Sequence, residues 1–252
     1  MSAEERHREI TALVRTQGYV SNEDLAQRLN VAVQTIRRDV NLLARRGLVA
    51  RHHGGAGLAS SVENIAYSER QVLNRRAKEA IGSLAARQIP DNSSLFVSIG
   101  TTTEAFAKSL RRHKALRVIT NNLHVATPLS AQTDFQVIVT GGQVRFYDGG
   151  ITGSTASTFI EQYRTDFAVI GISGIEDDGT LLDFDADEIS VAQAMMRNAR
   201  RVYLLADQTK FGRRPMGRLG HLSHVHGFFT DRQPSEQICA MLRAHDVELH
   251  IA

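Results

Sequence analysis

The spacing of apolar residues over residues 1–46 predicts three short helices. The first is expected at residues 3–16 and ends before Gly18, and the second opens at Ser21, whose side chain can cap it. The third is expected at residues 33–46. Two short helices joined by a turn of about three or four residues are typical of a helix-turn-helix motif. The pattern therefore predicts a small helical domain at the N-terminus.

The third helix has two unlike faces. Ile36, Val40 and Leu43 are spaced so that they share one face. Polar side chains are left on the other face, where Gln can pair with adenine, Arg with guanine, and Arg or Thr with phosphate oxygens. An Arg pair on a helix is more often only a solvated face, but a predicted wing at residues 48–55 supports DNA binding. The predicted DNA-binding residues are Ser21, Gln34, Thr35, Arg37, Arg38, Asn41, Arg51, His52 and His53.

Apolar runs and helical patterns alternate from residue 76 onward, which favours a mainly parallel sheet covered on both faces. The predicted strands are residues 95–99, 118–120, 137–140, 167–170, 202–206, 227–230 and, at an edge, 248–251. The predicted helices are residues 76–88, 104–112, 124–131, 154–163, 187–199 and 234–244. The sequence thus predicts an α/β protein with a winged helix-turn-helix domain at residues 1–57, a linker at 58–75 and a larger domain at 76–252.

Polar clusters follow five of the predicted strands, where parallel sheets bind ligands. Gly100 precedes three threonines at a helix start, so free N–H groups and hydroxyls can cradle an anion. The spacings of ATP- and NAD-binding loops are missing, whereas Lys210 offers a point charge suited to phosphate. Each cluster alone is compatible with turn chemistry, but their recurrence favours a binding site. The predicted ligand-binding residues are Gly100, Thr101, Thr102, Thr103, Thr120, Asn121, Asn122, Gly141, Gly142, Arg145, Gly171, Asp183, Asp185 and Lys210.

Composition and charge narrow the class of protein. The 252 residues are 42% hydrophobic and 23% charged, as in ordinary globular proteins. The net charge of +3 comes from residues 1–57, which hold nine Lys or Arg and six Asp or Glu. A basic module on a neutral body is typical of a DNA-binding domain with a separate control domain. No apolar run is long enough for a membrane span or a secretory signal, and the single cysteine, Cys239, fits a helix core, so a cytoplasmic protein is expected.

Several motifs make the chain resemble the DeoR family of bacterial repressors. In the N-terminal domain they are Arg6, Ile10 and Val14, residues 35–40 and residues 51–56. The strand-end motifs at residues 100–103, 120–122, 141–145 and 207–212 resemble the family's sensor domain, which is similar to sugar-phosphate isomerases. Family members often have Ser where this chain has Ala32, which cannot cap the third helix, a loss of about 1 kcal/mol.

The resemblance implies a repressor, not an enzyme, that a small phosphorylated metabolite releases from double-stranded operator DNA. Residues 34–39, 51–56, 148–151 and 171–175 look most like members that control glycerol 3-phosphate metabolism, so glycerol 3-phosphate is the expected effector. The resemblance also implies a homo-oligomer, with a tetramer expected. No cofactor, metal, catalytic residue or membrane contact is expected.

Two clusters of residues also allow interpretations other than a repressor. His221, His224 and His226 have a metal-like spacing, but no carboxylate or Cys ligand is near in sequence. The acids Asp183, Asp185, Asp187 and Glu188 could move a proton in an isomerase, although acids also stabilise a helix start, which is the preferred interpretation. A sugar-phosphate isomerase with a DNA-binding head, an activator or architectural protein, and a repressor with another sugar-phosphate effector remain as alternatives.

Overall fold

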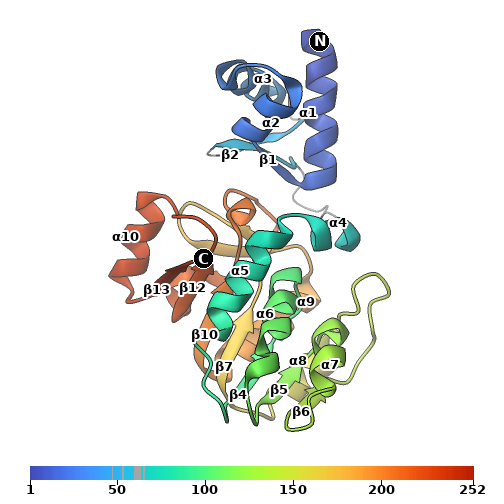
Figure 1. Ribbon diagram of the computed structural model, residues 1–252, viewed down its shortest axis with the longest axis vertical. Helices are drawn as coiled ribbons and strands as arrows, with labels where there is room; N and C mark the ends of the chain where they lie inside the picture. The colour runs from blue at the N-terminus through green and yellow to red at the C-terminus, as the bar shows by residue number, and fades with distance from the viewer. Residues whose placement is uncertain (47, 53, 60–63, 65) are drawn as a thin grey trace.

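The chain forms a small N-terminal domain and a larger α/β domain, with helix α4 (Tyr67–Val72) between them (Figure 1). The computed structural model describes residues 1–46, 48–52, 54–59, 64 and 66–252. Helix α4 lies inside the predicted linker at residues 58–75, to which the sequence assigned no structure. A helix of this length without an apolar stripe shows little hydrophobic periodicity in the sequence. Which of its residues become half-buried is decided by contacts with the neighbouring domains.

The N-terminal domain is a winged helix. Its helices are α1 (Ala3–Gln17), α2 (Asn22–Leu29) and α3 (Val33–Arg45), and its strands are β1 (Tyr19–Ser21), β2 (Ala50–His52) and β3 (Gly55–Gly57). The sheet order is β1-β3-β2, and β2 and β3 form the wing. Ser21 caps α2 by accepting a hydrogen bond from the N–H of Asp24, and Ala32 gives α3 no side-chain cap, as predicted. The predicted three helices and wing are confirmed.

The larger domain contains a seven-stranded, entirely parallel sheet in the order β13-β12-β10-β7-β4-β5-β6. Its strands are β4 (Ser94–Val97), β5 (Arg117–Thr120), β6 (Gln136–Val139), β7 (Thr165–Ile170), β10 (Ala199–Leu205), β12 (Gly227–Thr230) and β13 (Glu248–Ile251). All seven predicted strands are therefore present, and the one at residues 248–251 is an edge strand.

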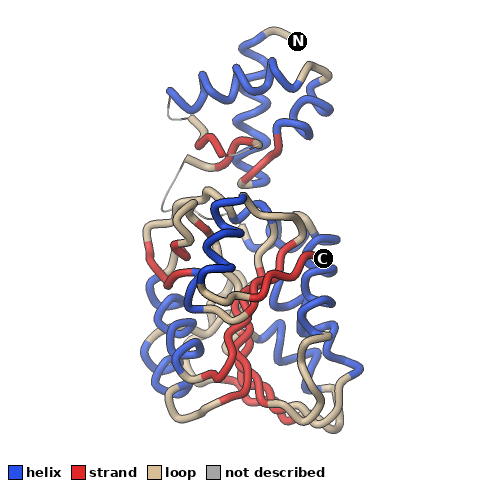
Figure 2. Tube along the Cα trace, turned by 90° about the vertical axis from the view of Figure 1, so that its left-hand side faces the viewer, coloured by secondary structure: helices blue, strands red, loops and turns tan. Residues whose placement is uncertain are grey.

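Helices cover both faces of this sheet, as Figure 2 shows. They are α5 (Arg75–Ala86), α6 (Thr101–Ser109), α7 (Leu123–Ser130), α8 (Ser154–Ile160), α9 (Ala186–Arg197) and α10 (Glu236–Ala244), with short 3-10 turns η1 (Leu110–Arg112), η2 (Gln208–Lys210) and η3 (Leu222–His224). None of the described helices is both long and apolar enough to cross a membrane.

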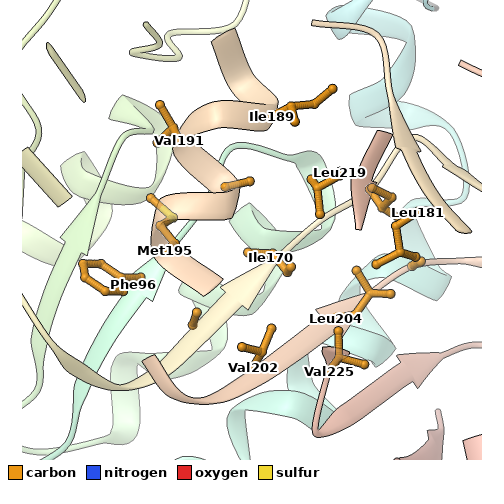
Figure 3. Packing of buried hydrophobic residues seen from close by; sticks show 14 of the residues in the cluster. Phe96, Ile170, Leu181, Ile189, Val191, Met195, Val202, Leu204, Leu219 and Val225 are labelled. Carbon is orange, nitrogen blue, oxygen red and sulfur yellow. The ribbon is translucent and has the colours of Figure 1, made fainter. Parts of the chain in front are cut away.

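Alternation along the strands divides the apolar core into two layers. Leu95 and Val97 of β4 pack beneath α5, α6 and α7, whereas Phe96 points to the opposite face, under α8 and α9. In Figure 3, Met195 of α9 lies over this second layer. Because successive side chains point to opposite faces, a continuous apolar run becomes a strand that is buried on both sides.

A second, antiparallel sheet was not predicted. It contains β8 (Gly174–Ile175), β9 (Thr180–Asp183) and β11 (Gly217–His221), in the order β11-β9-β8. These strands have two to five residues, and β11 contains two glycines and an irregular register. Such short strands show too few alternations to be distinguished from loops. This sheet adjoins the acidic group after β9 and so shapes the site.

The carboxyl ends of the parallel strands face the N-terminal domain. Asn74, just before α5, donates to Asp207 after β10, and Tyr67 of α4 donates to Glu104 after β4. The α4 helix also contacts α1 of the N-terminal domain. The edge of the sheet at which a ligand would bind is therefore the edge next to the winged helix.

Candidate functional site

The outer face of α3 is free for contact with DNA. Ile36, Val40 and Leu43 are buried, while Arg37 and Arg38 are exposed. Gln34 is exposed as well, and Thr35 and Asn41 are half-buried. The predicted division of this helix into an inner and an outer face is confirmed, and the role of the outer residues in binding DNA stays a prediction.

Asp39 fixes the position of α3, a role that the sequence analysis missed. Its carboxylate accepts from Arg6 Nε at 2.5 Å and contacts His7 Nε2 at 2.8 Å, both on α1. Burial alone would raise the pKa of Asp39, but the hydrogen bonds from Arg6 and His7 outweigh it and hold the pKa below its usual value. Asp39 follows Ile36 by three residues, so helical spacing could have placed it on the buried face.

Of the predicted wing residues that the structure describes, Arg51 and His52, one faces solvent. Arg51 is exposed, but His52 is half-buried on the opposite side of β2, as alternation requires. The ring of His52 lies against Gly212 of the larger domain, and its Nε2 atom has no hydrogen-bond partner among the described residues. Burial, followed by Arg213 and Arg214, lowers the pKa of His52 to about 4. The expected contact between His52 and phosphate does not fit this position, and His53 lies outside the described residues.

The start of α6 keeps the features of an anion cradle. Gly100 has a φ of 149°, and no side chain caps the helix. The N–H groups of the first turn therefore receive no hydrogen bond acceptor from a capping side chain. Thr103 is buried and donates to the carbonyl oxygens of Ser98 and Gly100, at 2.8 and 2.7 Å. Thr102 is buried and Thr101 half-buried. Gly171 lies beside Gly100, so this part of the predicted site is assembled.

Three predicted ligand-binding residues are instead used inside the protein. Thr120 donates to the carbonyl oxygen of Val97 at 2.7 Å, and the Asn121 amide donates to that of Ile151 at 2.9 Å. Asn122 donates to Glu104 and caps α7 through the N–H of His124. All three residues are buried. They hold the sheet edge together, and the prediction that they contact a ligand directly does not fit their burial.

Gly141 and Gly142 also fail to reach the centre of the site. Both are exposed in the loop after β6, and neither lines the cavity described below. Gly142 has a φ of 134° and lies close to Ile151, so a glycine is required there by the backbone. The glycine pair, which the sequence analysis assigned to ligand binding, instead serves the turn after β6.

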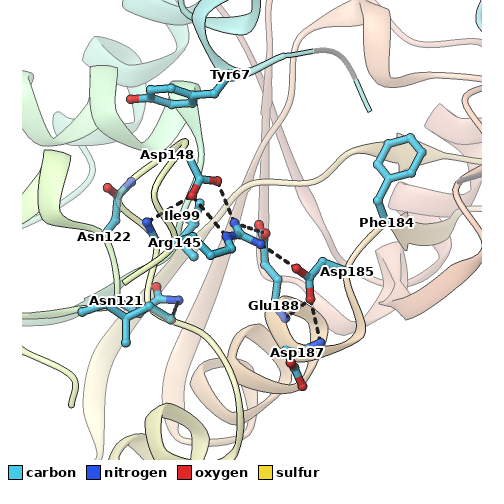
Figure 4. A network of polar contacts seen from close by, with 12 residues as sticks. Tyr67, Ile99, Asn121, Asn122, Arg145, Asp148, Phe184, Asp185, Asp187 and Glu188 are labelled. Carbon is cyan, nitrogen blue, oxygen red and sulfur yellow. Dashed lines mark hydrogen bonds and ion pairs between the residues drawn. The ribbon is translucent and has the colours of Figure 1, made fainter. Parts of the chain in front are cut away.

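Arg145 is the centre of an acidic cluster (Figure 4). Its guanidinium contacts Asp148 and Asp185 at 2.7 Å and Glu188 at 2.8 Å. Asp185 also caps α9 by accepting from the N–H groups of Asp187 and Glu188, which confirms that these acids begin a helix. Burial and the nearby Asp183 raise the pKa of Glu188 to about 7, and burial raises the pKa of Asp183.

A basic group stands beside this acidic cluster. Burial and Arg213 lower the pKa of Lys210 to about 7. Burial also lowers the pKa of the buried Lys78. Asp207 is buried; burial would raise its pKa, but the charges of Lys210 and Lys78, with hydrogen bonds from Thr209, outweigh that effect and lower it. A further anion near the two lysines would favour their charged forms and would itself be attracted by them.

A cavity of about 540 Å³ opens between α4 and the acidic cluster. Tyr67 and Arg70 line it on the linker side, and Arg145, Asp183 and Glu188 line it on the other. Carboxylates can accept hydrogen bonds from ligand hydroxyls, and cations can hold a phosphate. The arrangement suits a small molecule that carries both groups. Glu104, Asp148, Tyr67 and Arg70 were missed, because their neighbours are set by tertiary contacts.

The histidine motif does not converge on one point. His221 contacts Ser223 Oγ at 2.8 Å and the carbonyl oxygen of Asp178 at 2.7 Å, and His226 accepts from the N–H of Val202. Within the part of the chain that the structure describes, no group of three or more His, Cys, Asp or Glu residues is arranged to hold a metal.

Comparisons with known proteins bear on both domains. A family model described as a DeoR-like helix-turn-helix domain matches residues 6–62, and one described as the DeoR C terminal sensor domain matches residues 73–232. The chain is 45% identical over 251 residues to the glycerol-3-phosphate regulon repressor of Escherichia coli K12, covering 100% of both chains.

Two solved structures are similar to this chain to different degrees. The chain resembles the tetrameric eIF2B-beta2-delta2 complex from C. thermophilum, with a TM-score of 0.57, 15% identity and coverage of 97% of this chain and 96% of that chain. At that identity the likeness shows the fold alone. Ribose 5-phosphate isomerase A from Methanocaldococcus jannaschii matches with a TM-score of 0.41, 15% identity and coverage of 56% of each chain, a likeness too low to carry an argument.

Proposed function

Because the chain belongs to the DeoR family, we propose that it represses a carbon-catabolism operon and leaves operator DNA when a phosphorylated metabolite binds. The relative from Escherichia coli is named for the glycerol 3-phosphate regulon, and it matches this chain over its full length. That match supports glycerol 3-phosphate metabolism as the regulated pathway and glycerol 3-phosphate as the effector. It also supports a cytoplasmic regulator that is not an enzyme.

The observation that carries the proposal is the pairing of an exposed polar helix face with a separate charged cavity. Arg37 and Arg38 lie on a helix whose opposite face is the core of the N-terminal domain. That helix has the size and polarity to enter a major groove. The cavity lies in the other domain, at the sheet edge that faces the winged helix. A ligand there can alter the position of the DNA-binding domain without touching DNA.

Glycerol 3-phosphate fits the division of charge within the site. Its phosphate would bind between Lys210 and the start of α6, and its hydroxyls would donate to carboxylates such as Asp183 and Asp185. Glu104 lies in the first turn of α6, so its carboxylate opposes an anion there, and the nearby basic group must offset it. We propose that two or more winged helices in a homo-oligomer, with a tetramer expected, bind repeated half-sites.

Filter binding tests this function. An operator duplex would be selected from a randomised pool with the full chain, and its Kd measured with increasing glycerol 3-phosphate. Thermodynamic linkage requires DNA and ligand to weaken each other by the same factor, expected to be at least about fivefold. Glycerol without phosphate is the control ligand. An operator affinity that no phosphorylated compound changes would contradict release by an effector, and sedimentation of the free protein would test the tetramer.

An isomerase is the second candidate, because the pKa of one carboxylate in the cavity lies near neutral pH. Glu188 has a pKa raised to about 7, which is the range that suits a general base. However, Glu188 already contacts Arg145, so its role as a structural ion pair is the simpler explanation. Assays of the full chain with ribose 5-phosphate and glucosamine 6-phosphate separate the two functions. Turnover that disappears in Glu188→Gln would favour the enzyme.

A further inference from the structure

Arg70 is a cation of the linker helix that lies inside the cavity. Its side chain is 16% exposed, and it lines the same space as Asp183 and Glu188. Its guanidinium pairs with the Asp148 carboxylate at 3.8 Å. That carboxylate is already held by Arg145 at 2.7 Å. The ion pair between Arg70 and Asp148 is therefore long and shared.

One of the donors of Arg70 is unused. Among the described residues, its Nε atom is buried and has no hydrogen-bond partner. A buried donor without an acceptor is destabilising, and more so when the group is charged. The structure thus keeps a guanidinium in a cavity with an unmade hydrogen bond, which is the arrangement expected of a group whose acceptor is a ligand.

The backbone around Arg70 is fixed on both sides. The Lys78 ammonium donates to the carbonyl oxygen of Arg70, and Tyr67, three residues earlier, donates to both oxygens of Glu104 at 3.0 Å. Tyr67 also stacks on the ring of His124. The helix α4 is thereby tied to the carboxyl edge of the sheet on one side, and it contacts α1 of the winged helix on the other.

We propose that Arg70 binds the anionic group of the effector together with Lys210 and that, because α4 carries Arg70, occupancy of the cavity acts directly on the linker to the DNA-binding domain. The inference rests on the proposed effector function. A guanidinium can bind a phosphate or carboxylate through two parallel N–H groups. The acceptor supplied by the ligand satisfies Nε and so changes the contacts that hold α4, and through α4 the position of the winged helix.

The test is calorimetry of the full chain carrying Arg70→Met, with glycerol 3-phosphate, glycerol and inorganic phosphate as probes. The Kd for glycerol 3-phosphate is expected to rise at least about tenfold, the effect of losing a charge-assisted hydrogen bond. Operator affinity without ligand is expected to stay within about threefold, because Arg70 does not lie on α3. Arg75→Met is the matched control, since Arg75 is an exposed residue at the start of α5.

A second measurement addresses the linker. At concentrations that saturate the Arg70→Met variant with glycerol 3-phosphate, the ligand should weaken operator binding by a smaller factor than in the parent protein. A residue with a merely structural role would not change this factor at saturation. An unchanged factor would overturn the coupling through Arg70.

An unchanged Kd in Arg70→Met overturns the inference and leaves the proposed function intact. If the parent protein itself binds no phosphorylated probe, the proposed effector function fails instead, so the two failures are distinct. If circular dichroism shows that Arg70→Met does not fold, the same calorimetry is carried out with Arg70→Lys. It keeps the charge but loses the planar fork, so its Kd is expected to rise, and a Kd within about twofold of the parent would overturn the proposal.

Discussion

The imidazole ring of His52 packs directly against the backbone of Gly212. The space that a Cβ atom on Gly212 would occupy is taken by Nδ1, Cγ and Cε1 of the ring. His52 belongs to the wing, and Gly212 follows Lys210 by two residues. The loop that carries a proposed ligand-binding lysine therefore touches the DNA-binding domain. This contact and the α4 helix are two separate links between the sensor and the winged helix.

The first prediction is that Gly212→Ala destabilises the contact between the domains. Gly212 has a φ of 72°, and a left-handed conformation costs about 1–2 kcal/mol in a residue with a side chain. The new methyl group would also overlap the ring of His52. Thermal unfolding of the full chain is expected to show a loss larger than the conformational cost alone, and His52→Ala in the same chain should restore part of it.

Gly153→Ala is the control for this prediction. Gly153 has a φ of 92°, and a Cβ there would meet no atom within 4 Å. It should therefore show the conformational cost without any overlap, and His52→Ala should not restore it. A loss in Gly212→Ala that His52→Ala does not reduce would mean that the His52 contact is absent in solution.

The second prediction concerns the ion pairs that hold α3 on α1. Asp39→Asn keeps the shape of the side chain but removes the charge that faces Arg6 and His7, so unfolding by urea should reveal a loss of about 1–3 kcal/mol. The pKa of Asp39 is held below its usual value in the folded chain. Its contribution is thus present above the ordinary value of 3.8 and is lost as pH falls through the lower, folded pKa.

Asp24→Asn is the matched control, because Asp24 is an exposed acid in the first turn of α2. Its effect is expected to stay within about 0.5 kcal/mol. If Asp39→Asn were as mild as Asp24→Asn at neutral pH, the Asp39 ion pairs would not be what positions the recognition helix.

Most of the fold could be predicted because its elements have strong periodic patterns. Ile36, Val40 and Leu43 mark one helix face, and the runs at residues 227–230 and 248–251 match β12 and β13 residue for residue. The helix α4 and the antiparallel sheet were missed, since each of their segments is too short to show a period. Their structure comes from contacts made across the chain.

The site was only partly predictable for a related reason. Strand ends gather at one edge of a parallel sheet, so Gly100, Gly171 and Lys210 could be assigned to that edge from sequence. Which polar side chains point outward depends on packing, and Asn121 and Asn122 proved to be buried. Arg70 lies in the segment without a pattern, and no local signal connects it with residues more than a hundred positions later.

The third prediction separates DNA contact from ligand response. Arg37→Ala or Arg38→Ala should each weaken operator binding by about 1–3 kcal/mol if the residue pairs with a base edge, and should leave the Kd for glycerol 3-phosphate unchanged. Both residues are exposed, so thermal stability should not change. Arg111→Ala, an exposed arginine of the sensor domain, is the control in the same filter-binding assay. Equal losses in Arg37→Ala and Arg111→Ala would indicate a general charge effect.

The fourth prediction follows from the pKa of Lys210, which is about 7 in the protein without ligand. A phosphate favours the protonated ammonium, so binding above pH 7 requires uptake of a proton. The phosphate itself is a dianion once pH exceeds its second pKa of about 6. The affinity for glycerol 3-phosphate is therefore expected to fall as pH rises from 7 to 9, by at most about tenfold per unit.

Calorimetry in buffers with different ionisation enthalpies would measure the proton uptake directly. Lys210→Met should bind more weakly and lose both the uptake and the fall in affinity, while its operator binding without ligand stays unchanged. Lys210→Arg should keep its charge throughout this range, since arginine is not deprotonated in proteins, and its affinity should be independent of pH. A parent protein whose affinity is the same at pH 7 and pH 9 would place the phosphate away from Lys210 and leave Arg70 to hold it.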